Sequence, residues 1–263
     1  MGSGTLVPLL FFNTCCMEFK FKDRKYISHP EWGIVHPNYN YWFDPSCIDR
    51  SSSRIILSVI DNPQVAYHYG EGGKITYYKK EIGAGRLQSK DSYLYGVFEW
   101  RYSLPIGRNL WPAIWLTGVN DWPPEIDVME GWSSRKGHYK NKTDYSRFLH
   151  LFNDIQPRLH HRLNGVLSST AKKLFNNNYT WRLYQKMNKT NTCKLIWTPD
   201  IIQVFYNNHL VFECKDPYLL SYYNKPMWVV MNNAVTDDFT KEDLKTIKKH
   251  FIIYDFKYTQ IDI

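Results

Sequence analysis

The sequence predicts an all-β protein, with the packed sheets of a β-sandwich or barrel in one domain. Along the 263 residues, short runs of β-branched and aromatic residues recur and end at turn signals such as Asp-Asn-Pro, Thr-Pro-Asp and Asn-Asn. A helical pattern is seen over residues 240–247, and it is only a turn or two long. Regularly spaced strands with little helix are typical of packed antiparallel sheets.

Strands are expected, in chain order, over residues 54–60, 93–104, 194–197, 201–206, 209–213, 225–231 and 251–258. Two of these runs stop at Pro63 and Pro105, because proline cannot donate a backbone hydrogen bond to a neighbouring strand. Asn207 and Asn208 separate two other runs, and a two-residue turn of this type predicts a β-hairpin.

The first 25 residues are expected to be an extension to a single domain that covers residues 26–263. Residues 5–17 are apolar but lack a basic start and a clean small-x-small cleavage site. A secretion-signal remnant, a tag and an edge strand therefore all stay open for the extension. No apolar run reaches the roughly 18 residues that a membrane-spanning helix needs, so no membrane span is expected.

Charge and composition narrow the class of partner. Lys and Arg number 33 against 25 Asp and Glu, and the net charge of +8 either favours anionic partners or only keeps the protein soluble. The sequence has neither zinc-finger spacing nor a Gly-rich phosphate loop, so no nucleic-acid partner is expected. Aromatic residues make up 17% of the chain, an excess that predicts an aromatic-lined binding surface.

Three acids lie close together in one predicted strand: Glu125, Asp127 and Glu130. Because strand side chains alternate, Glu125 and Asp127 share a face, whereas strict alternation would put Glu130 on the other face. One extra residue, a β-bulge at Val128 and Met129, restores the phase. The three carboxylates are then expected on one face, above an apolar underside.

Such a set of acids is what glycoside hydrolysis requires. Carboxylates held close together have pKa values that are pushed apart, and the reaction needs one ionised carboxylate and one protonated carboxyl. The spacing of Glu125 and Glu130 favours the carboxyl separation of about 5–5.5 Å that a retaining mechanism uses. The spacing does not tell the nucleophile from the acid. An exposed acidic strand without a catalytic role is the alternative.

The segment Glu-Ile-Asp-Val-Met-Glu at residues 125–130 resembles the signature of glycoside hydrolase family 16. It is similar to the bulged Glu-x-Asp-x-x-Glu form of laminarinases, agarases, carrageenases and porphyranases. Further segments resemble strands of the family in the same order, over residues 85–101, 110–116, 196–206, 225–232 and 254–258.

The resemblance implies a jelly-roll sandwich of two curved antiparallel sheets with a concave substrate cleft. It implies Glu125 as nucleophile, Glu130 as acid/base and Asp127 as the assisting carboxylate of a double displacement. No cofactor is required for this chemistry. Some family members hold a structural calcium with an aspartate of the last strand, and Asp255 matches that position. A monomer that acts outside the cell, at its surface or in the periplasm is expected.

Tryptophans are the expected sugar-binding side chains, because their rings stack on the apolar faces of sugars. Trp111 and Trp115 are four residues apart in one strand and therefore share a face, which the family pattern puts at the cleft. Trp132 follows the last acid closely and is expected to bind substrate in the same way.

Other candidate contacts are polar. Arg86 and Asn109 match family positions near the cleft, and both are expected to bind substrate. His150 alternates against its apolar neighbours and is expected to point into the cleft, with a structural histidine as the alternative. His160 and His161 are expected in a surface loop.

These features together predict a retaining endo-β-glycosidase that cleaves a β-linked polysaccharide. β-1,3-Glucan and an agar-, carrageenan- or porphyran-type galactan both stay open, and the positive charge tilts the prediction toward an anionic galactan. The alternatives are a transglycosylase on the same scaffold and a non-catalytic carbohydrate-binding protein. Binding alone does not require two glutamates that titrate differently, which argues against the last.

Overall fold

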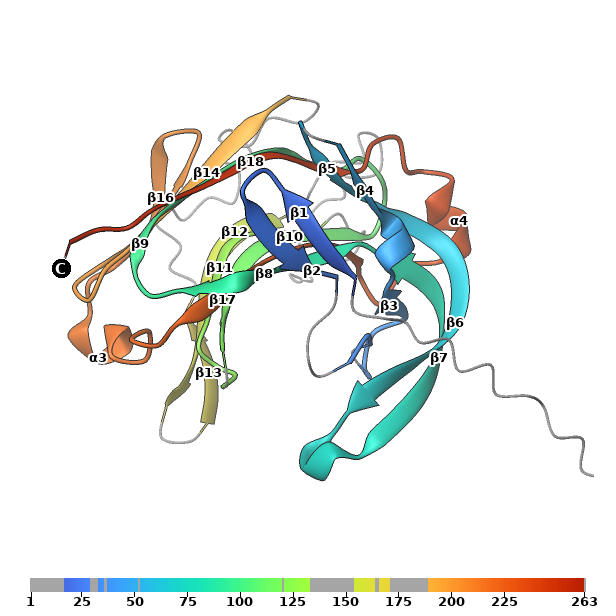
Figure 1. Ribbon diagram of the computed structural model, residues 1–263, viewed down its shortest axis with the longest axis horizontal. Helices are drawn as coiled ribbons and strands as arrows, with labels where there is room; N and C mark the ends of the chain where they lie inside the picture. Colours follow the sequence, from blue (N-terminus) through green and yellow to red (C-terminus); the bar gives the residue numbers. More distant parts are fainter. Residues whose placement is uncertain are drawn as a thin grey trace, which may run out of the picture.

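Two large antiparallel sheets face each other, and a smaller third sheet projects from one end (Figure 1). The computed structural model describes residues 17–28, 33–35, 37–51, 53–119, 121–132, 154–163, 166–170 and 189–262. The predicted all-β sandwich is confirmed. No helix in these ranges is long and apolar enough to cross a membrane.

The first large sheet has eight strands, which lie side by side in the order β1 (Glu18–Phe21), β2 (Arg24–Ile27), β8 (Arg86–Tyr93), β17 (Met227–Val235), β10 (Leu110–Gly118), β11 (Glu125–Trp132), β12 (Asp154–Leu163) and β13 (Val166–Thr170). The second has seven strands, in the order β16 (His209–Cys214), β15 (Ile202–Tyr206), β14 (Asn191–Trp197), β9 (Gly96–Ser103), β18 (Phe251–Thr259), β5 (Ile55–Leu57) and β4 (Ile48–Arg50). Short helical segments are η1 (Pro45–Cys47), η2 (Glu71–Gly73), α3 (Pro217–Leu220) and α4 (Lys241–Leu244).

The main core lies between the two large sheets, and β9 shows how the sequence builds it. Phe98, Trp100 and Tyr102 are buried in this core, whereas Glu99 and Arg101 between them are exposed. The period of two in the sequence therefore becomes an apolar inner face and a charged outer face of the strand.

The third sheet contains β3 (Tyr41–Phe43), β7 (Ile75–Ala84) and β6 (Val59–Tyr69). It has a small core of its own, formed by Ile34, Val35, Trp42 and Ala66. Figure 1 shows that the β6–β7 hairpin and the β12–β13 hairpin project on the same side of the eight-stranded sheet, away from the seven-stranded sheet. We call this face of the eight-stranded sheet the outer face.

Most predicted strands are found, with one informative difference. The asparagine hairpin is confirmed between β15 and β16, where Asn207 and Asn208 have φ of 46° and 68°, as this turn type requires. The run predicted over residues 54–60 is two strands, because the chain leaves one sheet after Leu57 and enters another at Val59. Residues 18–25, assigned above to the extension, form β1 and the start of β2 at the edge of the eight-stranded sheet.

Candidate active site

The three acids lie in β11, which is paired with β10 on one side and β12 on the other. Against β10, the acids lie opposite alternate residues, namely Thr117, Trp115 and Ala113. Alternate positions of one strand point to one face, so the three carboxylates share a face. The register shifts by one residue between Asp127 and Glu130 against both neighbours, and Val128 has no partner in either. The predicted β-bulge is confirmed.

The apolar residues of β11 fix which face this is. Ile126, Val128 and Met129 are fully buried in the core between the two large sheets. The hydroxyl of Tyr206 donates a hydrogen bond of 2.9 Å to the carbonyl oxygen of Val128 and holds the bulge from the core side. The acids therefore point to the outer face, the side on which the two hairpins project.

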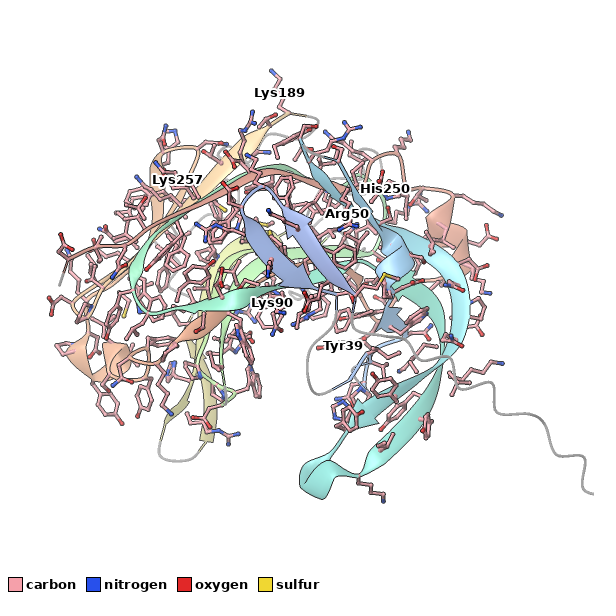
Figure 2. The ribbon with its side chains drawn as sticks, viewed as in Figure 1. Tyr39, Arg50, Lys90, Lys189, His250 and Lys257 are labelled. Atoms are coloured by element: carbon pink, nitrogen blue, oxygen red, sulfur yellow. The ribbon has the colours of Figure 1, made fainter. Side chains whose placement is uncertain are left out.

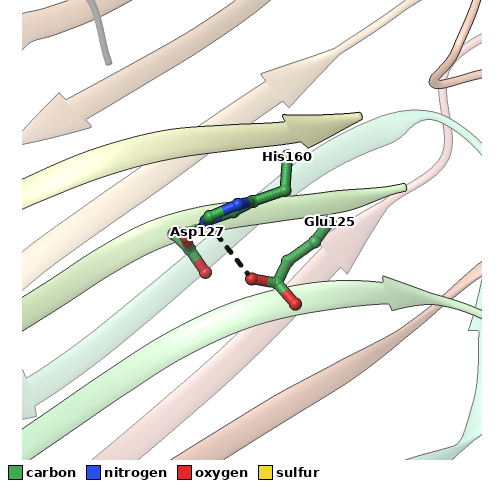
Figure 3. Close-up of side chains that lie close together, drawn as sticks. All are labelled: Glu125, Asp127 and His160. Carbon is green, nitrogen blue, oxygen red and sulfur yellow. Dashed lines mark ion pairs between the residues drawn. The ribbon is translucent and has the colours of Figure 1, made fainter. Parts of the chain in front are cut away.

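His160 joins two of the acids (Figure 3). It lies in β12 opposite Glu125, and its Nε2 is 3.2 Å from Asp127 Oδ2 and 3.6 Å from Glu125 Oε1. The side chains are mostly buried: that of His160 is 18% exposed, that of Asp127 5% and that of Glu125 15%. The prediction of a surface loop for His160 is wrong, because residues 154–163 are a strand and the alternation of β12 turns this histidine toward the acids.

The same strand corrects the prediction for His161, which is buried and not in a surface loop. Its Nδ1 is 3.1 Å from the hydroxyl of Tyr223, on the core side of the sheet. The sequence held one signal for this burial, the apolar Leu159 two positions earlier. Residues two apart in a strand share a face, and both Leu159 and His161 are buried.

The protonation of Glu125 is set by opposing influences. Burial and the negative charge of Asp127 raise the pKa of Glu125 well above its ordinary value. One donor acts the other way: the indole Nε1–H of Trp122 donates to Glu125 Oε2 at 2.7 Å and lowers the pKa of Glu125.

Glu130 also has an indole donor. Trp111 Nε1 donates to Glu130 Oε1 at 2.9 Å, and Glu130 is 8% exposed. The ring of Tyr39 meets the ring of Trp111 edge-on, with centroids 5.2 Å apart, and Figure 2 shows Tyr39 beside β3 on the outer-face side. Burial and the charges of nearby acids, Glu130 among them, raise the pKa of Tyr39. Sequence analysis missed Tyr39, because it lies in a short loop without a motif.

Trp115 and Arg86 lie next to each other on the outer face. Trp115 Nε1 donates to Asn232 Oδ1 at 2.7 Å, and Asn232 lies opposite Arg86 in the register of β17 and β8. The Arg86 guanidinium is 5.9 Å from the centre of the Trp115 ring and 5.2 Å from that of Phe43, and Arg86 is 1% exposed. These contacts orient the Trp115 ring, and substrate binding by Arg86 and Trp115 stays a prediction.

Asn109 is engaged at the end of the sheet. It lies four residues before Ala113, the residue opposite Glu130. Its Nδ2 donates to the carbonyl oxygen of Asp238 at 3.2 Å and to Asp243 Oδ2 at 3.0 Å, which ties β10 to α4. The structure thus gives Asn109 a supporting position, and substrate binding by Asn109 stays a prediction.

Two predicted contacts are not placed by the structure. The backbone of Trp132 ends β11, but its side chain lies outside what the structure describes. His150 lies outside the described residues altogether. Both therefore stay predictions.

The position matched to a calcium site is filled by an ion pair. The Asp255 carboxylate binds the ammonium of Lys22, and among the described residues the ligand-type side chains that cluster in threes are Glu125, Asp127 and His160. A carboxylate held by an ammonium does not fit a calcium ion, which needs several oxygen ligands. Calcium at Asp255 stays a prediction that the present contacts do not favour.

Relatives of known activity share parts of this sequence. The chain is 29% identical over 198 residues to a keratan-sulfate endo-1,4-beta-galactosidase of Sphingobacterium multivorum, a match that covers 70% of this chain and 38% of the relative. It is 42% identical over 57 residues to a glucan endo-1,3-beta-glucosidase of Cryptopygus antarcticus, which covers 19% and 21%. The chain thus spans well under half the length of these relatives.

The fold is also found among solved structures. LamAcat from Zobellia galactanivorans superposes with a TM-score of 0.58 at 19% identity, over 91% of this chain and 92% of that one. At this identity the likeness concerns the fold alone. The family model for glycosyl hydrolases family 16 matches residues 56–249, which include the whole acid strand. Both the bulged acid strand and this match lead to one conclusion: the chain belongs to glycosyl hydrolases family 16.

Proposed function

We propose that this protein is a retaining endo-β-glycosidase that cleaves a β-linked polysaccharide by double displacement. The observation that carries the proposal is the bulge at Val128, which turns Glu125, Asp127 and Glu130 to one face of β11. Family membership supports the reaction class, because the family is one of glycosyl hydrolases. The names of the matched relatives, both endo-glycosidases, support endo action.

The proposed first step uses both glutamates. An oxygen of the Glu125 carboxylate forms a bond to the anomeric carbon, while the bond from that carbon to the leaving oxygen breaks and Glu130 gives its proton to that oxygen. In the second step Glu130 takes a proton from water, whose oxygen displaces Glu125 from the anomeric carbon. Asp127, whose Oδ2 is 3.2 Å from His160 Nε2, adjusts the charge around Glu125.

The sugar is a β-1,3-glucan or a galactan, and two observations favour an anionic galactan. The net charge of +8 attracts an anionic polymer, and the longest of the matches reported above is to an enzyme named for keratan sulfate. Tryptophans 111 and 115 would stack on the sugar rings. Action outside the cell is part of the same proposal, because intact polysaccharides do not enter cells. We also propose that the protein acts as a monomer.

Product analysis on laminarin, agarose, porphyran, carrageenan and keratan sulfate tests the proposal. We expect oligosaccharides from at least one of them, with the β-anomer formed first by NMR, and a loss of about 10²–10⁴-fold or more in Glu125→Gln and Glu130→Gln. Glu99→Gln, an exposed position of β9, is the matched control and should keep full activity.

Each alternative has its own outcome in the same experiment. Products longer than the substrate, formed when an acceptor oligosaccharide is added, identify a transglycosylase. Binding to a glycan with no release of reducing ends from any of them identifies a binding protein. Full activity of Glu125→Gln, or an α-anomer formed first, contradicts the proposal.

A further inference from the structure

Trp122 lies at the end of the chain segment that leads into β11, three residues before Glu125. Its indole Nε1 donates to Glu125 Oε2 at 2.7 Å, a distance typical of a hydrogen bond to a charged acceptor. Yet Trp122 is 50% exposed, whereas Trp100 and Trp197 are buried in the core. A large apolar ring left in solvent, with its polar atom bound to one catalytic carboxylate, is not explained by packing of the core.

The segment that carries Trp122 is held from both sides. The amide of Gly118 donates to the carbonyl oxygen of Pro124 at 3.0 Å, and Lys225 Nζ pairs with Asp121 Oδ2 at 2.6 Å. A Cβ on Gly118 would lie 2.4 Å from the carbonyl oxygen of Asp121, so the close approach requires glycine. The position of Trp122 over Glu125 is therefore built by its surroundings.

The Trp122 ring lies close to the place where a reacting sugar must bind. A reacting anomeric carbon must lie about 3–3.5 Å from an oxygen of Glu125. The other oxygen of the same carboxylate is 2.7 Å from the indole nitrogen, so the half-exposed Trp122 ring lies within reach of a sugar bound at Glu125. Indole rings stack well on the apolar faces of sugars.

We propose that Trp122 is a positioning residue for Glu125, which its indole N–H orients as a carboxylate, and that its exposed ring contacts the reacting sugar. The inference rests on the proposed role of Glu125 as nucleophile. It assigns to Trp122 two separable contributions, one from the N–H and one from the ring.

The N–H contribution has a chemical reason. Glu125 must be ionised to attack the anomeric carbon and must leave as a carboxylate in the second step. Burial and Asp127 both oppose the ionised form, whereas the indole donor favours it. Removing the donor should therefore shift the protonation of Glu125 as well as its orientation.

Trp122→Phe and Trp122→Ala separate the two contributions. In Trp122→Phe the ring stays and the donor is lost, so the acid limb of the pH profile of kcat/KM should move up by about 1–2 pH units, with KM within about threefold of wild type. In Trp122→Ala the acid limb should move as far and KM should rise by about 3–10-fold. Trp42→Phe, which loses an indole hydrogen bond of 2.8 Å to the Asn62 carbonyl, is the matched control and should leave the acid limb in place.

A second readout does not depend on turnover. In protein labelled with ¹³C at the glutamate carboxyls, the signal that Glu125→Gln removes belongs to Glu125, and its titration midpoint should rise in Trp122→Phe and not in Trp42→Phe. An unchanged midpoint overturns the inference, as does an acid limb that Trp122→Phe does not move. If the wild type releases no sugar but the midpoint still moves, the role of Trp122 in orienting Glu125 stands and the proposed reaction fails.

Discussion

The bulge in β11 can be tested by deleting the residue that makes it. Val128 has no partner in β10 or β12, so its loss leaves every other pair of β11 in register. The deletion turns Glu-x-Asp-x-x-Glu into Glu-x-Asp-x-Glu, in which alternation alone keeps all three acids on one face. We therefore expect the variant without Val128 to fold with its acids on the outer face.

The cost of this deletion follows from two contacts. The Val128 side chain is fully buried, and its loss removes about 1.5–3 kcal/mol of hydrophobic stabilisation. The hydroxyl of Tyr206 loses its acceptor, which costs about 1–3 kcal/mol in a buried setting. For a chain of this size the sum lowers Tm by roughly 5–24 °C, which most folded proteins survive.

Deletion of Ile126 is the matched control. Ile126 is as deeply buried as Val128, but it occupies a regular strand position between two acids. Its loss shifts the register by one residue, so that either Glu125 or the remaining acids turn toward the core, where unpaired carboxylates are costly.

Thermal unfolding by circular dichroism, with initial rates on the active glycan, distinguishes the two deletions. The variant without Val128 should melt cooperatively and keep measurable activity, whereas the variant without Ile126 should be unfolded or inactive. If both deletions behave alike, or if only the loss of Ile126 is tolerated, the account of the bulge as a single inserted residue is wrong.

Three further predictions concern single side chains. Trp111→Phe removes the indole donor to Glu130, and kcat should fall about tenfold in initial-rate measurements, with the melting temperature little changed. Burial lowers the pKa of His161 below the ordinary value of 6.5, so below pH 6.5 the unfolded state binds more protons than the folded state. The free energy of unfolding should therefore fall as the pH drops below 6.5. In urea titrations at several pH values, His161→Gln should make this dependence of the free energy of unfolding on pH weaker. Gly96→Ala places a Cβ 2.4 Å from the ring of Tyr258 at a φ of 127°, and urea titration should show a loss of at least about 1–3 kcal/mol.

The acid strand could be predicted from the sequence because the parity of strand positions is a local property. Counting from Glu125 to Glu130 shows that alternation fails by one residue, and the apolar residues between the acids show which face is buried. The asparagine hairpin was predictable for the same reason, since the turn type depends on two adjacent residues.

The surroundings of the acids could not be predicted in this way. His160 reaches Glu125 across a strand pair, and Tyr39 reaches Trp111 from a loop far away in the chain, so both depend on which strands become neighbours. For Asn109 the resemblance gave a position near the site, but its amide is bound to α4, a contact that no local pattern contains. Pairings between distant segments are decided by the packed fold, whose strand order a single sequence does not specify.

These surroundings matter because the retaining reaction needs two glutamates of the same chemistry in different protonation states. The motif supplies two identical side chains, and only their partners distinguish them: Trp122 and His160 lie around Glu125, whereas Trp111 lies on Glu130. A match to the motif therefore identifies the family, but the division of roles depends on residues outside it. A chain that kept the three acids but lost the indole donors of Trp122 and Trp111 should keep the fold. Its activity should depend on pH differently from that of the wild type.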